Sequence, residues 1–270
     1  MAGKERAKQL ARQKFERQQA RRAAQAKKAQ RVKIIGGVTA VVVLGGGAAG
    51  VAAVMGGGDS KAKASTSPSA SASPQAGDGA PKLAITMQSV SISTAKANGT
   101  TTCKYNPSTS DKGAPKNLGT PPATPAYKGD VAATIKTNLG NLGITLDATK
   151  APCTTNSFAF LAAKKYFDNS KCHRLTTGGT GDLRVLQCGD PTATGQGGPG
   201  YKYNNENTAG AKYTRGVLAM ANSGANTNGS QFFIVYGDST SLPADYTIFG
   251  KVTSGLDVVD RVAKAGVAAQ

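Results

Sequence analysis

The sequence predicts a mainly β domain in the C-terminal half of the chain, an antiparallel barrel or sandwich capped by two helices. A basic helix, one transmembrane span and a disordered linker are expected to precede it. Short strand-like runs within residues 128–270 show no βαβ rhythm, which argues against a parallel sheet. Residues 34–58 carry no charge, which is the basis for the expected span. Eight of the 12 prolines fall between Pro68 and Pro125, so the composition changes near Lys128 and marks the expected start of the domain.

Residues 1–33 form a strongly basic arm. They carry 12 Lys and Arg against two Glu, which is +10 of the chain's net charge of +18. The arm is rich in helix formers, but Leu10 and Phe15 are its only large apolar residues, so it has no face to bury. We expect a cytoplasmic helix attracted to an anionic membrane surface. The arm has no base-reading motif, so no nucleic-acid partner is expected.

Residues 34–58 are the expected membrane anchor. At ~1.5 Å per residue, a helix of this length exceeds the ~30 Å hydrocarbon core of a bilayer. Nine of its 25 residues are glycine, so a cleaved signal peptide or a flexible tract remains an alternative, and 62–64 (Ala-Lys-Ala) resembles a cleavage site. Because basic flanks resist translocation, we expect a single-pass cell-membrane protein with a cytoplasmic N-terminus and an extracytoplasmic C-terminal domain.

Two polar segments separate this anchor from the expected domain. Residues 59–81 are a Ser/Ala/Pro tract with almost nothing to bury, which predicts a disordered linker. Residues 82–127 are rich in Pro and Thr and form a pre-domain segment with one short strand expected at 83–90.

Residues 128–270 have the patterns of a folded domain. Alternation over 131–137 and 142–146, with turn residues between, predicts a β-hairpin. Pro152 suits the first turn of a helix, and a last helix is expected at 256–263. The remaining short strands are expected at 171–175, 184–187, 216–220, 232–236 and 246–252.

The residue inventory excludes several classes of function. His173 is the only histidine and the four cysteines form no C-x-x-C pair, so we expect neither a multi-histidine metal site nor a zinc finger. Residues 195–200 match G-x-G-x-x-G, but Pro199 lies inside the motif and no helix follows, so no dinucleotide cofactor is expected. No nucleophile motif accompanies His173, which is interpreted as a structural, hydrogen-bonded residue.

Five sequence segments together point to one family. They are C-H-R-L at 172–175, L-Q-C-G-D at 186–190, G-x-G-G-P-G-Y at 195–201, MANSGANTNGSQFFIVY at 220–236 and Y-T-I-F-G-K-V at 246–252. Their order and spacing resemble the cyclophilin family of peptidyl-prolyl isomerases over 128–270, and in particular its membrane-anchored actinobacterial members. The resemblance implies an eight-stranded antiparallel barrel capped by two helices, with a proline-binding groove on its outer surface. It also implies a monomeric catalytic domain that isomerises Xaa-Pro bonds of secreted or cell-surface proteins and assists their folding.

The same resemblance implies the site residues. Arg174 falls on the catalytic position, and Phe233 and Leu242 on the positions that hold the proline ring. A twisted amide gains lone-pair density on the prolyl nitrogen, to which a fixed guanidinium can donate a hydrogen bond, so neither a metal nor a cofactor is required. The implied substrate-binding residues are Gln187, Ala221, Asn222 (through its backbone), Gln231, Phe233, Leu242 and Tyr246.

Two positions depart from the family's pattern. Arg184 stands where an aromatic residue is usual, unless residues 182–185 are aligned a residue or more out. Ser241 stands where many members have Trp. Because of these two departures, the pocket is expected to be less apolar. An Arg184 inside the pocket would favour an alternative function, a cyclophilin-fold peptide-binding or chaperone module with weak or no isomerase activity.

The four cysteines all follow the predicted span. In an oxidising compartment we expect them to pair, although four cysteines allow three connectivities and all four could instead be buried thiols. Cys172 and Cys188 flank the strands of Arg174 and Gln187, and an antiparallel pairing of those strands would bring them together. Cys103 would then join the pre-domain segment to the first helix at Cys153.

Overall fold

A computed structural model describes residues 78–93, 101–115, 117–179 and 182–268 of the chain. All of these belong to one compact unit. The expected basic arm, the expected span at 34–58 and all but the last four residues of the expected linker lie outside the described residues. Within the described part of the chain, no helix has the length and apolar character needed to cross a membrane.

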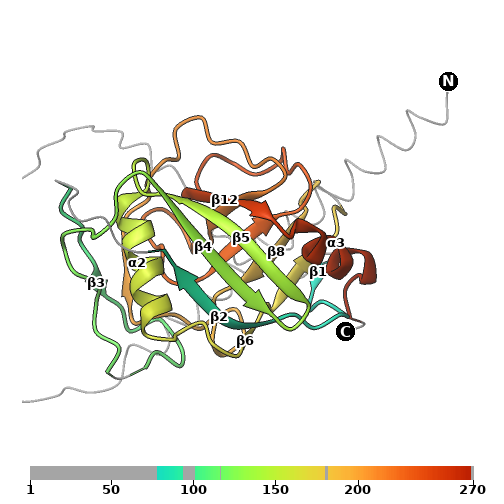
Figure 1. Cartoon of the computed structure of the whole chain (residues 1–270), viewed down its shortest axis with the longest axis horizontal. Coiled ribbons are helices and arrows are strands. Elements are labelled where there is room, and N and C mark those ends of the chain that lie inside the picture. Colours follow the sequence, from blue (N-terminus) through green and yellow to red (C-terminus); the bar gives the residue numbers. More distant parts are fainter. Residues whose placement is uncertain (1–77, 94–100, 116, 180–181, 269–270) are drawn as a thin grey trace, which may run out of the picture. The chain divides into compact units, whose positions relative to one another are not determined.

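The described residues have a mainly β architecture, as predicted, in which two helices pack on one large antiparallel sheet (Figure 1). The helices are α2 (Pro152–Ala163) and α3 (Leu256–Ala265). The strands β3 (Asn106–Pro107) and β9 (Tyr201–Lys202) form a separate, two-stranded antiparallel sheet. The strands of the large sheet are β1 (Asp78–Gly79), β2 (Thr86–Ile92), β4 (Asp130–Thr137), β5 (Gly140–Asp147), β6 (Ser170–Lys171), β7 (Arg174–Thr176), β8 (Val185–Cys188), β10 (Val217–Met220), β11 (Phe232–Val235) and β12 (Ile248–Ser254).

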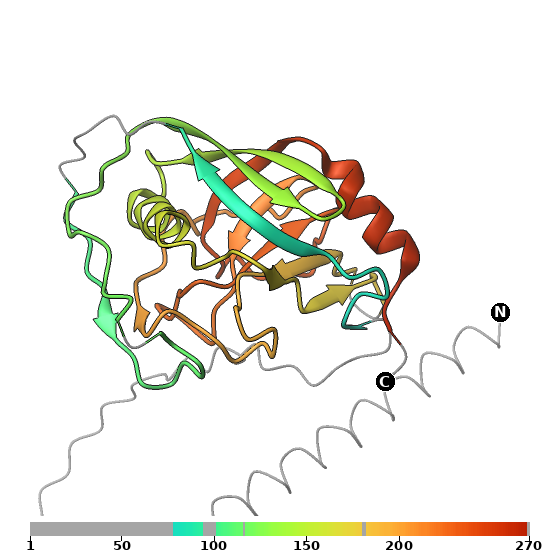
Figure 2. The same ribbon diagram turned by 60° about the horizontal axis from the view of Figure 1, so that its bottom comes forward.

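The strand order of the large sheet is β1-β7-β8-β11-β10-β12-β5-β4-β2-β6. Eight strands were expected, and the described residues form ten in this sheet because the two-residue strands β1 and β6 extend its ends. The single strand expected at 171–175 is divided at Cys172 and His173. Its first part, β6, pairs with β2, and its second part, β7, pairs with β8. At these two residues the chain passes from β6, at one end of the strand order, to β7, next to the other end, and the sheet curves into a barrel-like form (Figure 2).

The β4–β5 hairpin shows how the sequence builds this sheet. Its side chains alternate between the core and solvent, with Val131, Ile135, Leu142 and Leu146 among the buried set. The turn forms at Asn138, whose side chain accepts a hydrogen bond from the backbone N–H of Thr86 at 2.8 Å. This contact ties the hairpin to the start of β2.

Strand β2 changes the expected domain boundary. It comes from the segment 82–127 that was expected to precede the domain, and it pairs with β4 inside the sheet. Strand β1 lies within the last four residues of the expected linker 59–81. The folded unit therefore begins by Asp78, and not near Lys128, because these two segments complete backbone hydrogen bonding that β4 and β7 would otherwise lack.

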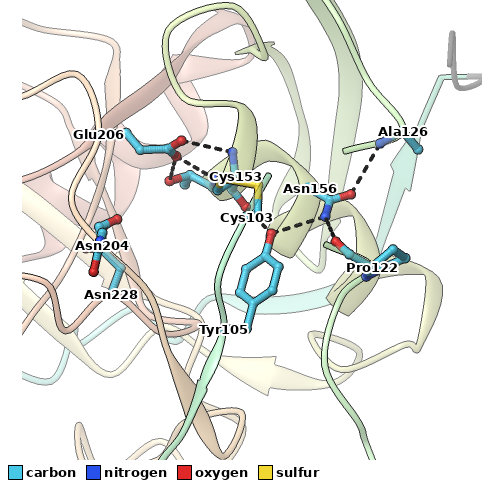
Figure 3. Close-up of a disulfide and its surroundings, with 10 residues drawn as sticks. Cys103, Tyr105, Pro122, Ala126, Cys153, Asn156, Asn204, Glu206 and Asn228 are labelled. Atoms are coloured by element: carbon cyan, nitrogen blue, oxygen red, sulfur yellow. Dashed lines mark hydrogen bonds between the residues drawn. A yellow bond between two sulfur atoms is a disulfide. The ribbon is translucent and has the colours of Figure 1, made fainter. Parts of the chain in front are cut away.

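Helix α2 begins at Pro152, as predicted, but Ala151 before it offers no side-chain cap. Glu206 takes that role from a distant loop. Its carboxylate accepts hydrogen bonds from the backbone N–H groups of Cys153 at 3.0 Å and Thr154 at 2.8 Å, and from the Thr154 hydroxyl at 2.7 Å (Figure 3). A negative charge at this end of a helix is also favoured by the helix dipole.

Both expected disulfides are present. Cys103 is bonded to Cys153 with a Cα–Cα separation of 5.4 Å, and Cys172 to Cys188 with a separation of 4.0 Å. The first attaches the segment 101–127 to the start of α2 (Figure 3). The second links the residues next to the strands of Arg174 and Gln187, as expected for an antiparallel pair of strands.

Tyr105 and Asn156 strengthen the attachment made by the first disulfide. The Tyr105 hydroxyl donates to the carbonyl oxygen of Cys153 at 2.8 Å, and the Asn156 amide donates to that hydroxyl and to the carbonyl oxygen of Pro122 at 2.8 Å. The segment 101–127 is thus held against α2 by one covalent bond and several hydrogen bonds.

Candidate active site

Three of the expected site residues form a row across adjacent strands. Arg174 of β7 lies directly opposite Gln187 of β8, and Gln187 lies directly opposite Phe233 of β11. Residues directly opposite one another in an antiparallel sheet project from the same face. Their chain neighbours on the other face, Leu175, Leu186 and Ile234, are buried in the main core. The row therefore faces outward from the barrel-like sheet.

This row lines a cavity of about 150 Å³ on the outside of the sheet. Seven of the eight expected site residues line it. Leu183 and Val185 line it as well; they were not among the expected site residues, and their only sequence signal is that they alternate with Gln187 along the chain. The complete lining is Arg174, Leu183, Val185, Gln187, Ala221, Asn222, Phe233, Leu242 and Tyr246.

Aromatic packing shapes the apolar end of the cavity. The rings of Phe233 and Tyr246 meet edge to face with centroids 5.6 Å apart, and Tyr213 packs behind both. The Tyr213 hydroxyl donates to the carbonyl oxygen of Tyr246 at 2.9 Å and accepts from its backbone N–H at 2.9 Å. Burial raises the pKa of Tyr246, so its phenol is neutral at pH 7. Leu242 is half-buried at the cavity edge.

A chain of hydrogen bonds forms the polar end. Arg174 Nη1 donates to Gln187 Oε1 at 3.2 Å, and Gln187 Nε2 donates to Gln231 Oε1 at 2.9 Å. Gln231 Nε2 in turn donates to the carbonyl oxygens of Gly195 at 3.0 Å and Gly197 at 2.9 Å. Because a carbonyl oxygen only accepts and a guanidinium only donates, the orientation of both glutamine amides is determined from both ends.

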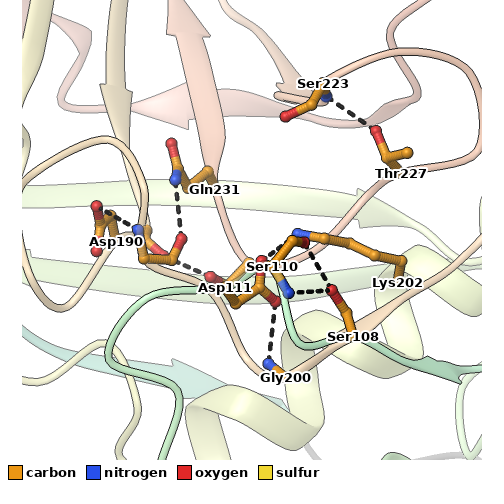
Figure 4. A network of polar contacts seen from close by, with 12 residues as sticks. Ser108, Ser110, Asp111, Asp190, Gly200, Lys202, Ser223, Thr227 and Gln231 are labelled. Atoms are coloured by element: carbon orange, nitrogen blue, oxygen red, sulfur yellow. Dashed lines mark hydrogen bonds and ion pairs between the residues drawn. The ribbon is translucent and has the colours of Figure 1, made fainter. Parts of the chain in front are cut away.

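Gln231 is the one expected site residue that does not line this cavity. It lines a neighbouring cavity of about 110 Å³, which shares Gln187, Ala221 and Asn222 with the first. Lys202 also lines the second cavity, and its ammonium group is paired with the buried carboxylate of Asp111 (Figure 4).

Asn222 lies at the junction of the two cavities with its side chain already engaged. Its amide donates to the carbonyl oxygen of Asp245 at 3.0 Å and accepts from the backbone N–H of Gly224 at 3.2 Å. The backbone of Asn222, and not this engaged side chain, is the part expected to bind a peptide. The roles of all these residues remain predictions.

Arg184 lies outside the cavity, contrary to the expectation that it would make the pocket less apolar. Its guanidinium pairs with Asp182 and lies next to Gly178, and its aliphatic stem lies next to Gly237. A shift of one residue along a strand exchanges its two faces, so Leu183 and Val185 take the cavity positions.

His173 lies partly buried between β6 and β7. Burial is the main influence on its pKa, which is lowered, so the imidazole is neutral near pH 7. The sequence predicted a hydrogen-bonded imidazole, but neither ring nitrogen of His173 has a hydrogen-bond partner among the described residues. Those residues also contain no cluster of His, Cys, Asp and Glu side chains able to hold a metal ion.

The glycine-rich run at 195–200 forms a loop before β9, and not the start of a helix. Asp190 holds this loop through hydrogen bonds from the backbone N–H groups of Gly197 at 3.0 Å and Thr192 at 2.8 Å. The run supplies acceptor carbonyls to Gln231.

Comparison with known proteins agrees with this geometry. The model of the family described as cyclophilin type peptidyl-prolyl cis-trans isomerase/CLD matches residues 132–270. The chain is 50% identical over 183 residues to the probable peptidyl-prolyl cis-trans isomerase B of Mycobacterium leprae, a match that covers 62% of this chain and 60% of the relative. Its counterpart in Mycobacterium tuberculosis strain H37Rv is 45% identical over 179 residues, covering 62% of this chain and 57% of the relative.

A shorter relative is matched over most of its length. The human peptidyl-prolyl cis-trans isomerase-like 3 is 40% identical over 141 residues, which is 51% of this chain and 84% of that protein. The chain thus spans less than two thirds of the two mycobacterial relatives and most of the human one.

Proposed function

Since the chain belongs to the cyclophilin-type family of peptidyl-prolyl cis-trans isomerases, we propose that it isomerises Xaa-Pro peptide bonds without a metal, a cofactor or a covalent intermediate. One observation carries this proposal. Arg174, Gln187 and Phe233 lie in one row on three adjacent strands and face a single cavity. A cation, an amide and an aromatic ring are thus placed within reach of one bound residue.

The chemistry required of such a site is the twisting of an amide. Rotation of a peptide bond has a barrier of ~18–20 kcal/mol because it breaks resonance. Phe233 and Leu242 would hold the proline ring, while Gln187 and the backbone of Asn222 bind the flanking peptide. Arg174 would donate a hydrogen bond to the prolyl nitrogen as its lone pair becomes localised. Such a bond is strongest when the amide is twisted, so it lowers the barrier.

A second candidate function is a peptide-binding or chaperone module with the same groove but weak or no catalysis. Its main support was an arginine in the pocket, and Arg184 pairs with Asp182 away from the cavity. The cavity wall beside Arg174 is formed by Leu183 and Val185 instead. The apolar surface that a proline ring requires is therefore present, which favours the isomerase.

A protease-coupled assay on an Xaa-Pro peptide tests the proposal directly. The full chain is expected to accelerate the cis-to-trans step in proportion to enzyme concentration, because uncatalysed exchange takes tens of seconds or longer. A rate equal to the uncatalysed one, together with measurable binding of the same peptide, would instead support the binding module.

We extend the proposal to the segments outside the described residues. Residues 1–33 would lie in the cytoplasm against the anionic membrane surface, residues 34–58 would span the membrane once, and the following segment would link the span to a monomeric extracytoplasmic domain. Its substrates would then be Xaa-Pro segments of secreted or cell-surface proteins. The charge of +10 on the arm and the uncharged 25-residue segment after it support this arrangement.

Cell fractionation tests this placement. The protein is expected in the membrane fraction, and protease added outside intact spheroplasts should digest the folded domain but spare the basic arm. A soluble species shortened at its N-terminus, as the main form, would show that residues 34–58 act as a cleaved signal.

A further inference from the structure

A carboxylate from outside the family-matched region binds the guanidinium of Arg174. Asp78 of β1 lies 96 positions earlier in the chain. Arg174 Nε donates to Asp78 Oδ1 at 2.8 Å and to Oδ2 at 3.1 Å, and Arg174 Nη2 donates to Oδ2 at 2.8 Å. The side chain of Asp78 is only 11% exposed. The contact is therefore a bidentate, partly desolvated ion pair, which is the geometry in which an arginine is held most firmly.

The backbone that carries Asp78 is itself held on two sides. On one side β1 pairs with β7, with Asp78 opposite Thr176. On the other side the next residues bind the C-terminal segment, since the carbonyl oxygen of Ala80 accepts from Ala268 N–H at 2.7 Å and Lys82 N–H donates to Gly266 at 2.9 Å. Figure 1 shows β1 beside α3 and the C-terminal end of the chain. The position of the carboxylate is thus determined by the fold.

Asp78 holds Arg174 without occupying the cavity. Arg174 lines the cavity, whereas Asp78 is not among its lining residues. Gln187 accepts from Nη1 on the other side of the guanidinium. A guanidinium has five N–H groups, and the contacts with Asp78 and Gln187 engage one on each nitrogen. The remaining donors on Nη1 and Nη2 are then available to a bound peptide in one fixed plane.

We propose that Asp78 is a positioning residue for the isomerase reaction, acting only through Arg174. This inference rests on the proposed function of the site. A free arginine side chain has many rotamers, and fixing one before substrate binds removes an entropic loss from the catalytic step. The contact should therefore raise kcat and leave the apolar binding of proline, which determines much of KM, nearly unchanged.

The test compares full-chain variants in the protease-coupled assay. Asp78→Ala is expected to lower kcat about tenfold and to change KM less than about twofold. Asp78→Asn should recover part of the loss, because an amide oxygen can still accept from Nε or Nη2. Asp260→Ala is the matched control. Asp260, on α3, forms a bidentate pair with Arg215 away from the cavity, and the variant should keep full activity.

A double variant separates positioning from a general structural effect. In the Arg174→Ala background, Asp78→Ala should cause no further loss of activity, because the residue through which it acts is gone. A further loss would overturn the proposal in favour of a structural role. An unchanged or increased kcat in Asp78→Ala would also overturn it, and an increase would mean that the carboxylate competes with the substrate for Arg174.

A spectroscopic measurement keeps the inference independent of turnover. The Arg174 Nε–H proton, followed by NMR, should exchange slowly with water in the unmodified chain and rapidly in Asp78→Ala. If the alanine variant does not fold, the same exchange rate is measured in Asp78→Asn. An unmodified chain that is inactive would refute the proposed function. The exchange rates would then still show whether Asp78 holds the Arg174 side chain in place. Equal exchange rates in the unmodified chain and the variant would overturn the positioning role of Asp78.

Discussion

Arg174→Ala is expected to lower kcat/KM for an Xaa-Pro peptide at least tenfold. This change corresponds to the loss of ~1.4 kcal/mol or more of transition-state stabilisation. The reason is that Arg174 is the only cationic side chain lining the cavity with Phe233 and Leu242 among the described residues. The measurement is the protease-coupled assay, with circular dichroism to establish that the variant is folded.

Two further variants make this prediction specific. Arg174→Lys should restore little activity, because an ammonium group cannot bind Asp78 in a bidentate manner and still present a directed donor. Arg184→Ala is the matched control, since Arg184 lies ten residues further along and is paired with Asp182 outside the cavity. It should retain activity close to that of the unmodified chain. Near-full activity in folded Arg174→Ala would refute the catalytic assignment.

Removal of the disulfide between Cys103 and Cys153 is expected to give the largest loss of stability. The bond closes a loop of 50 residues, and in the chain-entropy model such a loop contributes roughly 4 kcal/mol. The double variant Cys103→Ala/Cys153→Ala should therefore lower the free energy of unfolding by roughly this amount. Equilibrium unfolding in urea measures the difference.

The second disulfide supplies the comparison. Cys172–Cys188 closes a loop of only 16 residues, for which the same model gives about 3 kcal/mol. Thiol titration of the denatured, unreduced protein should find no free thiol, and four free thiols would contradict both pairings. A loss below ~1 kcal/mol for the first pair would mean that Tyr105 and Asn156 hold the segment 101–127 nearly as well without the bond.

Local patterns predicted the local elements of the fold. The hairpin at 131–137 and 142–146 and the two helices were found within a few residues of their expected limits, because alternation and helical periodicity are properties of short windows. Strands β1, β3 and β9 have two residues each and could not be predicted this way. They exist because distant backbone segments pair, which leaves no pattern in either segment.

The site shows the same limit. The family resemblance supplied the residues that line the cavity, but it could not decide between Arg184 and its neighbours. A shift of one residue in the alignment of 182–185 exchanges the residues on the two faces of the strand. Because the length of the loop before this strand was uncertain, the sequence did not determine which of its residues face the cavity. The contact between Asp78 and Arg174 had no sequence signal at all, because it joins residues 96 positions apart.

The place of β2 in the sheet has a consequence for where this protein can be cut. The match to the family model begins at residue 132, inside β4, whereas the compact unit that contains this strand reaches back at least to Asp78. A chain begun at the similarity boundary would lack β2 and leave one side of β4 without hydrogen-bonding partners. Such an open edge invites pairing with another molecule, so the shortened chain would tend to associate edge to edge. The stretch that matches the family model is therefore shorter than the stretch needed to complete the sheet.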